Sequence, residues 1–197
     1  MNWKDVEGMF EPGDGEAYQE IVSKVREHGL IVEVGCLYGK SICSVSGIIQ
    51  EKKLSVICCD VWDSGIEEGD EKKKHPYKDT HQKMLYNFTQ NTRQFGIRPY
   101  VVCGTSMDII SMMETILNLE ETRTPALVFL DNDHGYDWVS KELDAWYKYL
   151  HGSFILSGHD YSESFTDSVV KAVNEFAEKH RKTVKTYPNS TVWSIQL

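Results

Sequence analysis

Five short apolar segments recur along the chain, and stretches with helical spacing of apolar residues separate them. The apolar segments lie at residues 30–34, 54–60, 99–104, 126–131 and 153–158. Runs of this length are typical of strands buried on both faces, and strands joined through helices pair in parallel. The alternation therefore predicts an α/β fold: an open, doubly wound, mostly parallel sheet with helices on both faces.

The two ends of the chain and one long connection complete this arrangement. TVKTY, a Pro-Asn turn and TVWSIQL predict a C-terminal antiparallel hairpin. No repeat or linker divides the chain, so we expect one domain over residues 1–197, with residues 1–13 as an N-terminal arm. Asp14 is expected to cap the first helix. The polar connection at 61–79 is long enough to act as a lid over a binding site.

The composition limits the partners and the compartment. The net charge is −9, and a phosphate backbone favours clustered cations, so we expect no nucleic-acid partner. No apolar run approaches the ~20 residues of a membrane-spanning helix, and no export signal is visible, so we expect no membrane partner. The five cysteines form no CxxC pair, which predicts free thiols and a cytoplasmic protein. A homo-oligomer is left open.

Carboxylates gather where the predicted strands end. In an open parallel sheet, ligands bind outside the carboxyl ends of the strands. Four of the five segments that leave the strands carry acidic residues, and these segments are residues 33–39, 60–63, 104–106, 131–134 and 158–161. A solvated loop would explain any one of these acids, but the five segments together favour a reaction site.

The first two strand ends have the features of a nucleoside site. Gly35 and Gly39 lie between a strand and a helix, where Gly lets the backbone approach a ligand; a tight turn explains them equally well. Leu37 stands where dinucleotide-binding turns carry their middle Gly, which disfavours a pyrophosphate. Asp60 ends the second strand and can accept hydrogen bonds from both hydroxyls of a ribose, or cap a helix.

With these elements in place, the chain resembles class I S-adenosylmethionine-dependent methyltransferases. Within them it is similar to a small group with D-x-D-H and G-H-D-Y motifs and to metal-dependent sugar O-methyltransferases. The matching segments are VEVGCLYGKS, CCDVWD, CGTSMD, VFLDNDHGYDWV and SGHDYSESF. The resemblance implies a Rossmann-like three-layer sandwich around a mostly parallel seven-stranded sheet with a C-terminal antiparallel hairpin. It also implies O-methylation of a small hydroxylated acceptor, such as a sugar or glycoside.

The resemblance further implies roles for individual residues. Those near S-adenosylmethionine would be Glu33, Gly35 and Gly39 at the methionine part, Asp60 at the ribose, Val61, Trp62 and Ser106 at the adenosine, and Asp131. Asp131 would also bind a divalent cation such as Mg²⁺, with Asp160 and His159 as further candidate ligands. His134 would be the general base, because an imidazole titrates near neutral pH. A cation would lower the pKa of the acceptor hydroxyl.

Two positions depart from the pattern of the sugar enzymes, and three alternatives stay open. His159 precedes Asp160 where an acidic pair is usual, which removes an oxygen ligand that Mg²⁺ prefers. Asn132 stands where Gly is usual. His134 is also compatible with a residue that pins the turn through backbone carbonyls. The alternative functions are a non-catalytic cofactor-binding module of the same fold and a nicotinamide-dependent oxidoreductase.

Overall fold

The structure is a computed structural model that describes residues 1–62, 79–117, 124–163 and 167–197. Its centre is a seven-stranded sheet with the strand order β3-β2-β1-β4-β5-β7-β6. The strands are β1 (Leu30–Val34), β2 (Ser55–Asp60), β3 (Tyr100–Cys103), β4 (Leu127–Leu130), β5 (Ile155–Gly158), β6 (Lys185–Thr186) and β7 (Trp193–Gln196). The first five pair in parallel, and β7 is antiparallel to β5 and β6. The predicted sheet with its terminal hairpin is confirmed.

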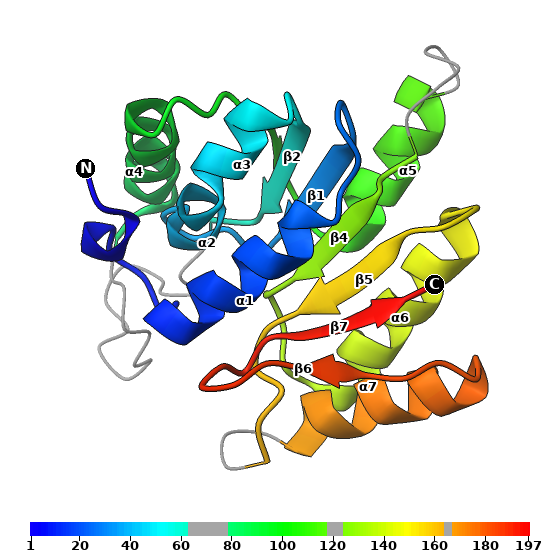
Figure 1. Cartoon of the computed structure of the whole chain (residues 1–197). Coiled ribbons are helices and arrows are strands. Elements are labelled where there is room, and N and C mark those ends of the chain that lie inside the picture. The colour runs from blue at the N-terminus through cyan, green and yellow to red at the C-terminus, as the bar shows by residue number, and fades with distance from the viewer. Residues whose placement is uncertain (63–78, 118–123, 164–166) are drawn as a thin grey trace.

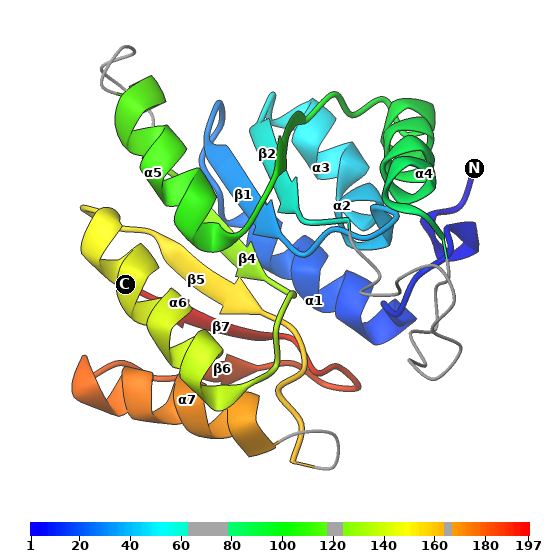
Figure 2. The same cartoon turned by 180° about the vertical axis from the view of Figure 1, so that it is seen from behind.

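Helices cover both faces of this sheet, so the fold has three layers (Figures 1 and 2). One layer contains α1 (Pro12–Ser23), α2 (Lys40–Ser44), α3 (Ser46–Glu51) and α4 (His81–Gln94). The other contains α5 (Ser106–Leu117), α6 (Tyr136–Tyr149) and α7 (Asp167–Lys179). A separate cluster of buried apolar side chains lies on each face. None of the helices in the described ranges has the length and apolar character needed to cross a membrane.

Several local predictions need correction. The helix expected after the first turn is interrupted at Val45, whose φ of −105° and ψ of 9° separate α2 from α3. The first helix starts at Pro12 instead of after Asp14, since proline suits the first helical position, where no N–H is needed. Four of the five free cysteines are buried as expected, but Cys103 is exposed. Most of the lid predicted at 61–79 lies outside the described residues.

The N-terminal arm packs against the rest of the chain. A short 3₁₀ helix, η1 (Trp3–Asp5), contacts α2. Further along the arm, Val6 and Phe10 are both buried. The Phe10 ring lies edge-on to Tyr18 of α1 and to Phe129 of β4. The arm therefore covers the sheet near the carboxyl end of β4, where a ligand is expected.

The strand order reverses between β1 and β4, and open α/β sheets bind ligands outside the carboxyl ends of the strands at such a reversal. Gly35 follows β1 with a φ of +84°. A Cβ atom on Gly35 would lie 1.8 Å from the carbonyl oxygen of Asp131, which follows β4. Only glycine allows the two strand ends to approach so closely. The fold thus brings the first and fourth predicted strand-end segments into direct contact.

Candidate active site

The carboxylate of Asp60 ties the end of β2 to the glycine turn after β1. Its Oδ2 accepts hydrogen bonds from the backbone N–H groups of Cys36 at 2.6 Å and Leu37 at 2.8 Å. Its Oδ1 accepts one from the N–H of Trp62 at 2.7 Å. A carboxylate has about four acceptor positions, so Asp60 keeps capacity for a hydroxyl of a ligand.

The turn is supported from below by aromatic side chains. Trp62 is fully buried, and its Nε1 donates to the carbonyl oxygen of Leu37 at 2.8 Å. Its ring centroid lies 5.2 Å from that of Phe88 on α4. Gly39 has a φ of +81°, and a Cβ there would lie 3.1 Å from the Phe88 ring. Val61 is exposed. Of the two residues predicted beside the adenosine, Val61 faces outward and Trp62 supports the turn.

Glu33 lies beneath the same turn, on the α1–α4 side of the sheet. It is fully buried and accepts hydrogen bonds from the Tyr18 hydroxyl at 3.0 Å and the Ser41 hydroxyl at 2.6 Å. Burial raises the pKa of its carboxyl group to about 8, although these two hydrogen bonds oppose the shift. Glu33 therefore links α1 to the start of α2, and its carboxyl group is not exposed to the crevice.

A second buried carboxyl group lies on the other face of the sheet. Glu142 of α6 is 1% exposed, and its Oε1 accepts a hydrogen bond from Nδ2 of Asn132 at 2.8 Å. Burial raises its pKa to about 7, against the opposing hydrogen bonds from Ser106 and Asn132. Ser106, also fully buried, accepts a hydrogen bond from Nε1 of Trp146 at 3.0 Å. Ser106 is thus fixed inside the layer of α5 and α6 and is not exposed at the strand ends.

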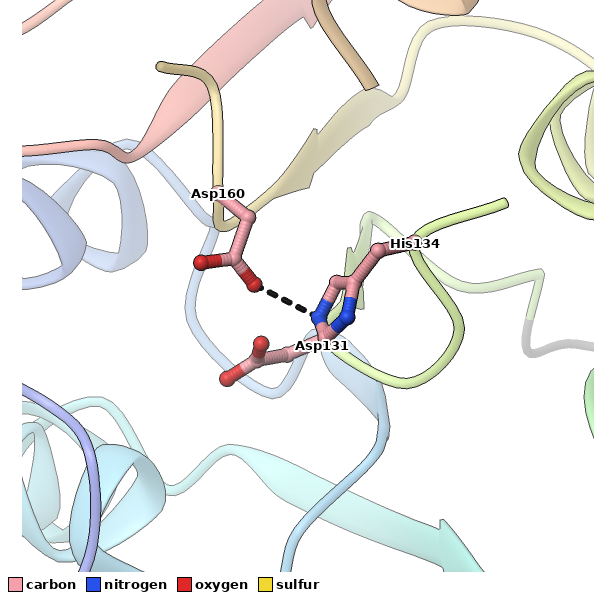
Figure 3. A group of neighbouring side chains, drawn as sticks. All are labelled: Asp131, His134 and Asp160. Atoms are coloured by element: carbon pink, nitrogen blue, oxygen red, sulfur yellow. Dashed lines mark ion pairs between the residues drawn. The ribbon is translucent and has the colours of Figure 1, made fainter. Parts of the chain in front are cut away.

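An imidazole and two carboxylates meet where β4 and β5 end (Figure 3). Nε2 of His134 lies 2.7 Å from Oδ2 of Asp160. One potential ligand atom from each of Asp131, His134 and Asp160 lies within 4.8 Å of the others. The hydrogen bond to Asp160 raises the pKa of His134 above its ordinary 6.5. Asp160 has a φ of +59°, a strained conformation for a residue with a side chain.

His159 lies behind this group, surrounded by three carboxylates. Its Nδ1 is 3.4 Å from Oδ1 of both Asp131 and Asp160, and its Nε2 is 3.2 Å from Oδ2 of Asp14. The ring packs on Phe10, with 5.4 Å between the ring centroids. Burial alone would lower the pKa of His159, but the three carboxylates outweigh burial and raise it to about 12. His159 is therefore an imidazolium at neutral pH.

Three of the four residues predicted to share one crevice lie close together. Gly35 lies against the Asp131 carbonyl, and Asp60 holds the turn that follows Gly35, whereas Ser106 is buried and bonded to Trp146. A family model described as a methyltransferase domain matches residues 32–161. The chain belongs to this methyltransferase family.

Solved methyltransferase structures resemble the chain across most of its length. CalS11, a TDP-rhamnose 3'-O-methyltransferase of calicheamicin biosynthesis, has a TM-score of 0.61 and 13% identity over 92% of this chain and 76% of its own. An O-methyltransferase from Bacillus cereus in complex with SAH has a TM-score of 0.60 and 14% identity, covering 98% and 84%. TomG from Streptomyces achromogenes, in complex with SAM, has a TM-score of 0.62 and 12% identity, covering 98% and 82%. The expected methyltransferase fold is confirmed. Comparison with curated protein sequences gives no match.

Two buried acids of this methyltransferase, Asp14 and Glu142, were not predicted from the sequence as site residues. Asp14 is buried, and its Oδ1 accepts hydrogen bonds from the Ser190 hydroxyl at 2.8 Å and the Thr191 N–H at 3.0 Å. Burial would raise its pKa, but His159 lowers it. Because Asp14 lies near the start of a helix, its sequence position indicates a helix cap and gives no sign of its contact with His159. Glu142 could have been predicted as a buried acid, because it lies on the apolar face of its helix.

Proposed function

We propose that this methyltransferase transfers the methyl group of S-adenosylmethionine to a hydroxyl group of a small acceptor, such as a sugar or glycoside. The observation that carries the proposal is a site with two parts, which meet where Gly35 lies against Asp131. The glycine turn held by Asp60 forms one part, and the imidazole–carboxylate pair of His134 and Asp160 forms the other. The similar structures add support, because they include O-methyltransferases with SAM or SAH bound and one named for TDP-rhamnose.

The cofactor lies across the glycine turn. Gly35 and Gly39 let the backbone approach its methionine part. Asp60 accepts hydrogen bonds from the ribose through the acceptor positions that its three bonds to backbone N–H groups leave unused. Val61 is exposed beside the adenosine. Glu33, Trp62 and Ser106, which are fully buried, act from beneath by holding the loops that contact the cofactor.

His134 is the general base. As the acceptor oxygen bonds to the methyl carbon, the carbon–sulfur bond breaks, the thioether leaves as S-adenosylhomocysteine, and His134 takes the hydroxyl proton. Asp160 raises the pKa of His134, which favours the protonated imidazole, and only the deprotonated form can act as the base. The rate should therefore rise with pH as His134 is deprotonated.

A divalent cation would fit beside this base. Asp131 and Asp160 each offer a carboxylate oxygen within 4.8 Å of the other and of a His134 ring nitrogen, and oxygen is the ligand that Mg²⁺ and Mn²⁺ accept, so the two carboxylates would hold the cation while His134 acts only as the base. When bound, the cation would lower the pKa of the acceptor hydroxyl. His159 stands behind the carboxylates and orients them.

Calorimetry tests the cofactor assignment directly. S-Adenosylmethionine and S-adenosylhomocysteine should both bind the intact protein, with dissociation constants on the order of 1–100 μM. NAD serves as the control nucleotide and should not bind. No heat from either adenosyl ligand at millimolar concentration would end the proposal.

Methyl transfer to a panel of glycosides and other small alcohols tests the base and the cation. His134→Gln should lower the transfer rate by roughly 10²- to 10⁴-fold while leaving S-adenosylhomocysteine affinity within about twofold.

Asp131→Asn and a chelator should both lower the rate, and Mn²⁺ binding followed by electron paramagnetic resonance should weaken in Asp131→Asn. Unchanged rates with chelator would remove the cation from the mechanism. Cofactor binding without transfer to any panel member would favour the non-catalytic module.

A further inference from the structure

A small hollow lies among the carboxyl ends of β4 and β5 and the helices α6 and α7. The proposed base His134 and its partner Asp160 line it, together with Asn132 and Glu142. Its free volume is about 10 Å³, which is room for one group about the size of a water molecule. One small substituent of the methyl acceptor therefore fits here, near the base, while the rest of the acceptor lies outside.

A buried carboxyl group in the wall of this hollow has an oxygen without a partner. Glu142 is 1% exposed, and its Oε1 accepts the hydrogen bond of 2.8 Å from Nδ2 of Asn132. In the part of the chain that the structure describes, Oε2 of Glu142 is buried and has no hydrogen-bond partner. An unpaired buried acceptor costs about 1–3 kcal/mol. A ligand that donates a hydrogen bond to Oε2 would remove this cost.

The side chain of Asn132 presents a second acceptor. A carboxylate accepts hydrogen bonds and cannot donate them, so the amide of Asn132 turns its NH₂ group toward Glu142. Its Oδ1 is then the polar atom left for a ligand, and it accepts no hydrogen bond from any described residue. Two acceptors in the wall of a hollow of this size call for one group with at least two donors. A hydroxyl group has only one.

The charges around the hollow favour a cation. Its titratable lining residues are Asp131, Asp133, His134, Glu142, His159 and Asp160. Both imidazoles pair with Asp160, and His159 pairs with Asp131 as well. Neither Asp133 nor Glu142 forms an ion pair within the described ranges. A primary ammonium group meets both needs, because it carries a positive charge and three donors.

We propose that this hollow binds a primary ammonium group of the methyl acceptor, with Glu142 as its counter-charge and Asn132 as its second hydrogen-bond acceptor, so that the substrate is an amino sugar or another amino alcohol. This inference rests on the proposed function. The ammonium group donates to Oε2 of Glu142 and Oδ1 of Asn132, and a neighbouring hydroxyl group of the same molecule lies beside His134. A protonated amine has no lone pair with which to attack the methyl carbon, so the hydroxyl oxygen receives the methyl group.

The test measures binding of matched amino and hydroxy compounds to the protein saturated with S-adenosylhomocysteine. The pairs are the methyl glycosides of glucosamine and glucose, those of galactosamine and galactose, and serinol and glycerol. In at least one pair the amino compound should bind roughly 10- to 100-fold more tightly in calorimetry, because its hydrogen bonds to Glu142 are charge-assisted. The N-acetyl derivative, which has no charge and is larger, should lose this advantage.

No advantage for the amino compound in any pair, including pairs in which neither compound binds, would overturn the inference and leave the proposed function standing. Failure of S-adenosylhomocysteine itself to bind would instead remove the proposed function. The two failures are therefore distinguishable in the same experiment.

Glu142→Gln tests the counter-charge. Glutamine keeps an oxygen that can accept from Nδ2 of Asn132, but it removes the negative charge, so the amino-to-hydroxy affinity ratio should fall to about threefold or less. The affinity for S-adenosylhomocysteine should stay within about twofold. Glu178→Gln, the same change at an exposed position of α7, is the matched control and should leave the ratio unchanged. An unchanged ratio in Glu142→Gln, or an equal loss of cofactor affinity, would overturn the inference.

Discussion

Replacing Gly35 by alanine should lower the free energy of unfolding by about 3–5 kcal/mol and abolish measurable cofactor binding. The added Cβ would lie 1.8 Å from the Asp131 carbonyl oxygen and 2.3 Å from its carbon. Both atoms belong to the backbone of the sheet and cannot turn away as a flexible side chain would. The φ of +84° adds strain, because residues with a side chain rarely adopt it. Urea unfolding and calorimetry with S-adenosylhomocysteine measure the two effects.

Gly47→Ala is the matched control for this substitution. Gly47 lies in α3, and a Cβ there would meet nothing within 4 Å. Alanine in an exposed helical position should stabilise the protein by about 0.5–1 kcal/mol and leave cofactor affinity unchanged. If the Gly35→Ala and Gly47→Ala proteins had equal free energies of unfolding, that result would contradict the close approach of Gly35 to the Asp131 carbonyl.

Replacing His159 by glutamine should cost about 3–5 kcal/mol of stability near pH 6, because three nearby carboxylates would lose their shared cation. The His159 side chain is only 10% exposed, so solvent screens these ion pairs weakly. Glutamine keeps similar volume and polarity, which isolates the effect of the charge. Urea unfolding of both proteins over a range of pH measures the difference, and His151→Gln, at an exposed histidine, is the control.

The pH dependence of this difference has a defined sign. The pKa of His159 is raised from 6.5 to about 12 in the folded protein, so its contribution is complete below pH 6.5 and is lost as pH rises above that value. The pKa of Asp160 is lowered from 3.8, so its contribution is present above pH 3.8 and is lost as pH falls. The difference between the two proteins should be widest between these limits. Equal stability near pH 6 would contradict the ion-pair cluster.

The sequence predicted the sheet well, and it singled out the strand ends that meet at one edge, because both follow from local patterns. Uninterrupted apolar runs predicted the parallel strands, and Gly35 and Asp60 stood out at strand ends. The pairing of His134 with Asp160 connects two such ends and agrees with the prediction that both lie in one site. Each of these inferences needed only residues near a strand end and the general rule that parallel strands end at one edge.

Contacts between distant parts of the chain could not be predicted in the same way. Asp14 has the usual features of a helix cap, and nothing near it in the sequence indicates that its partner is His159. The resemblance implied Trp62 beside the adenosine, and nothing in its polar stretch indicates that it is fully buried under the turn, with its ring packed on α4. Glu142 was accessible to prediction: a carboxyl group beside Val139 and Leu143 on an apolar helical face needs a buried partner.

The anchoring of Asp14 has a consequence for biosynthesis. Asp14 is held by Ser190 and Thr191, near the opposite end of the chain, while it pairs with His159 in the middle. A nascent chain on the ribosome exposes Asp14 first and the two anchoring residues last. The charge balance around His159 is therefore completed only after Ser190 and Thr191 have left the ribosome, long after Asp14 has emerged.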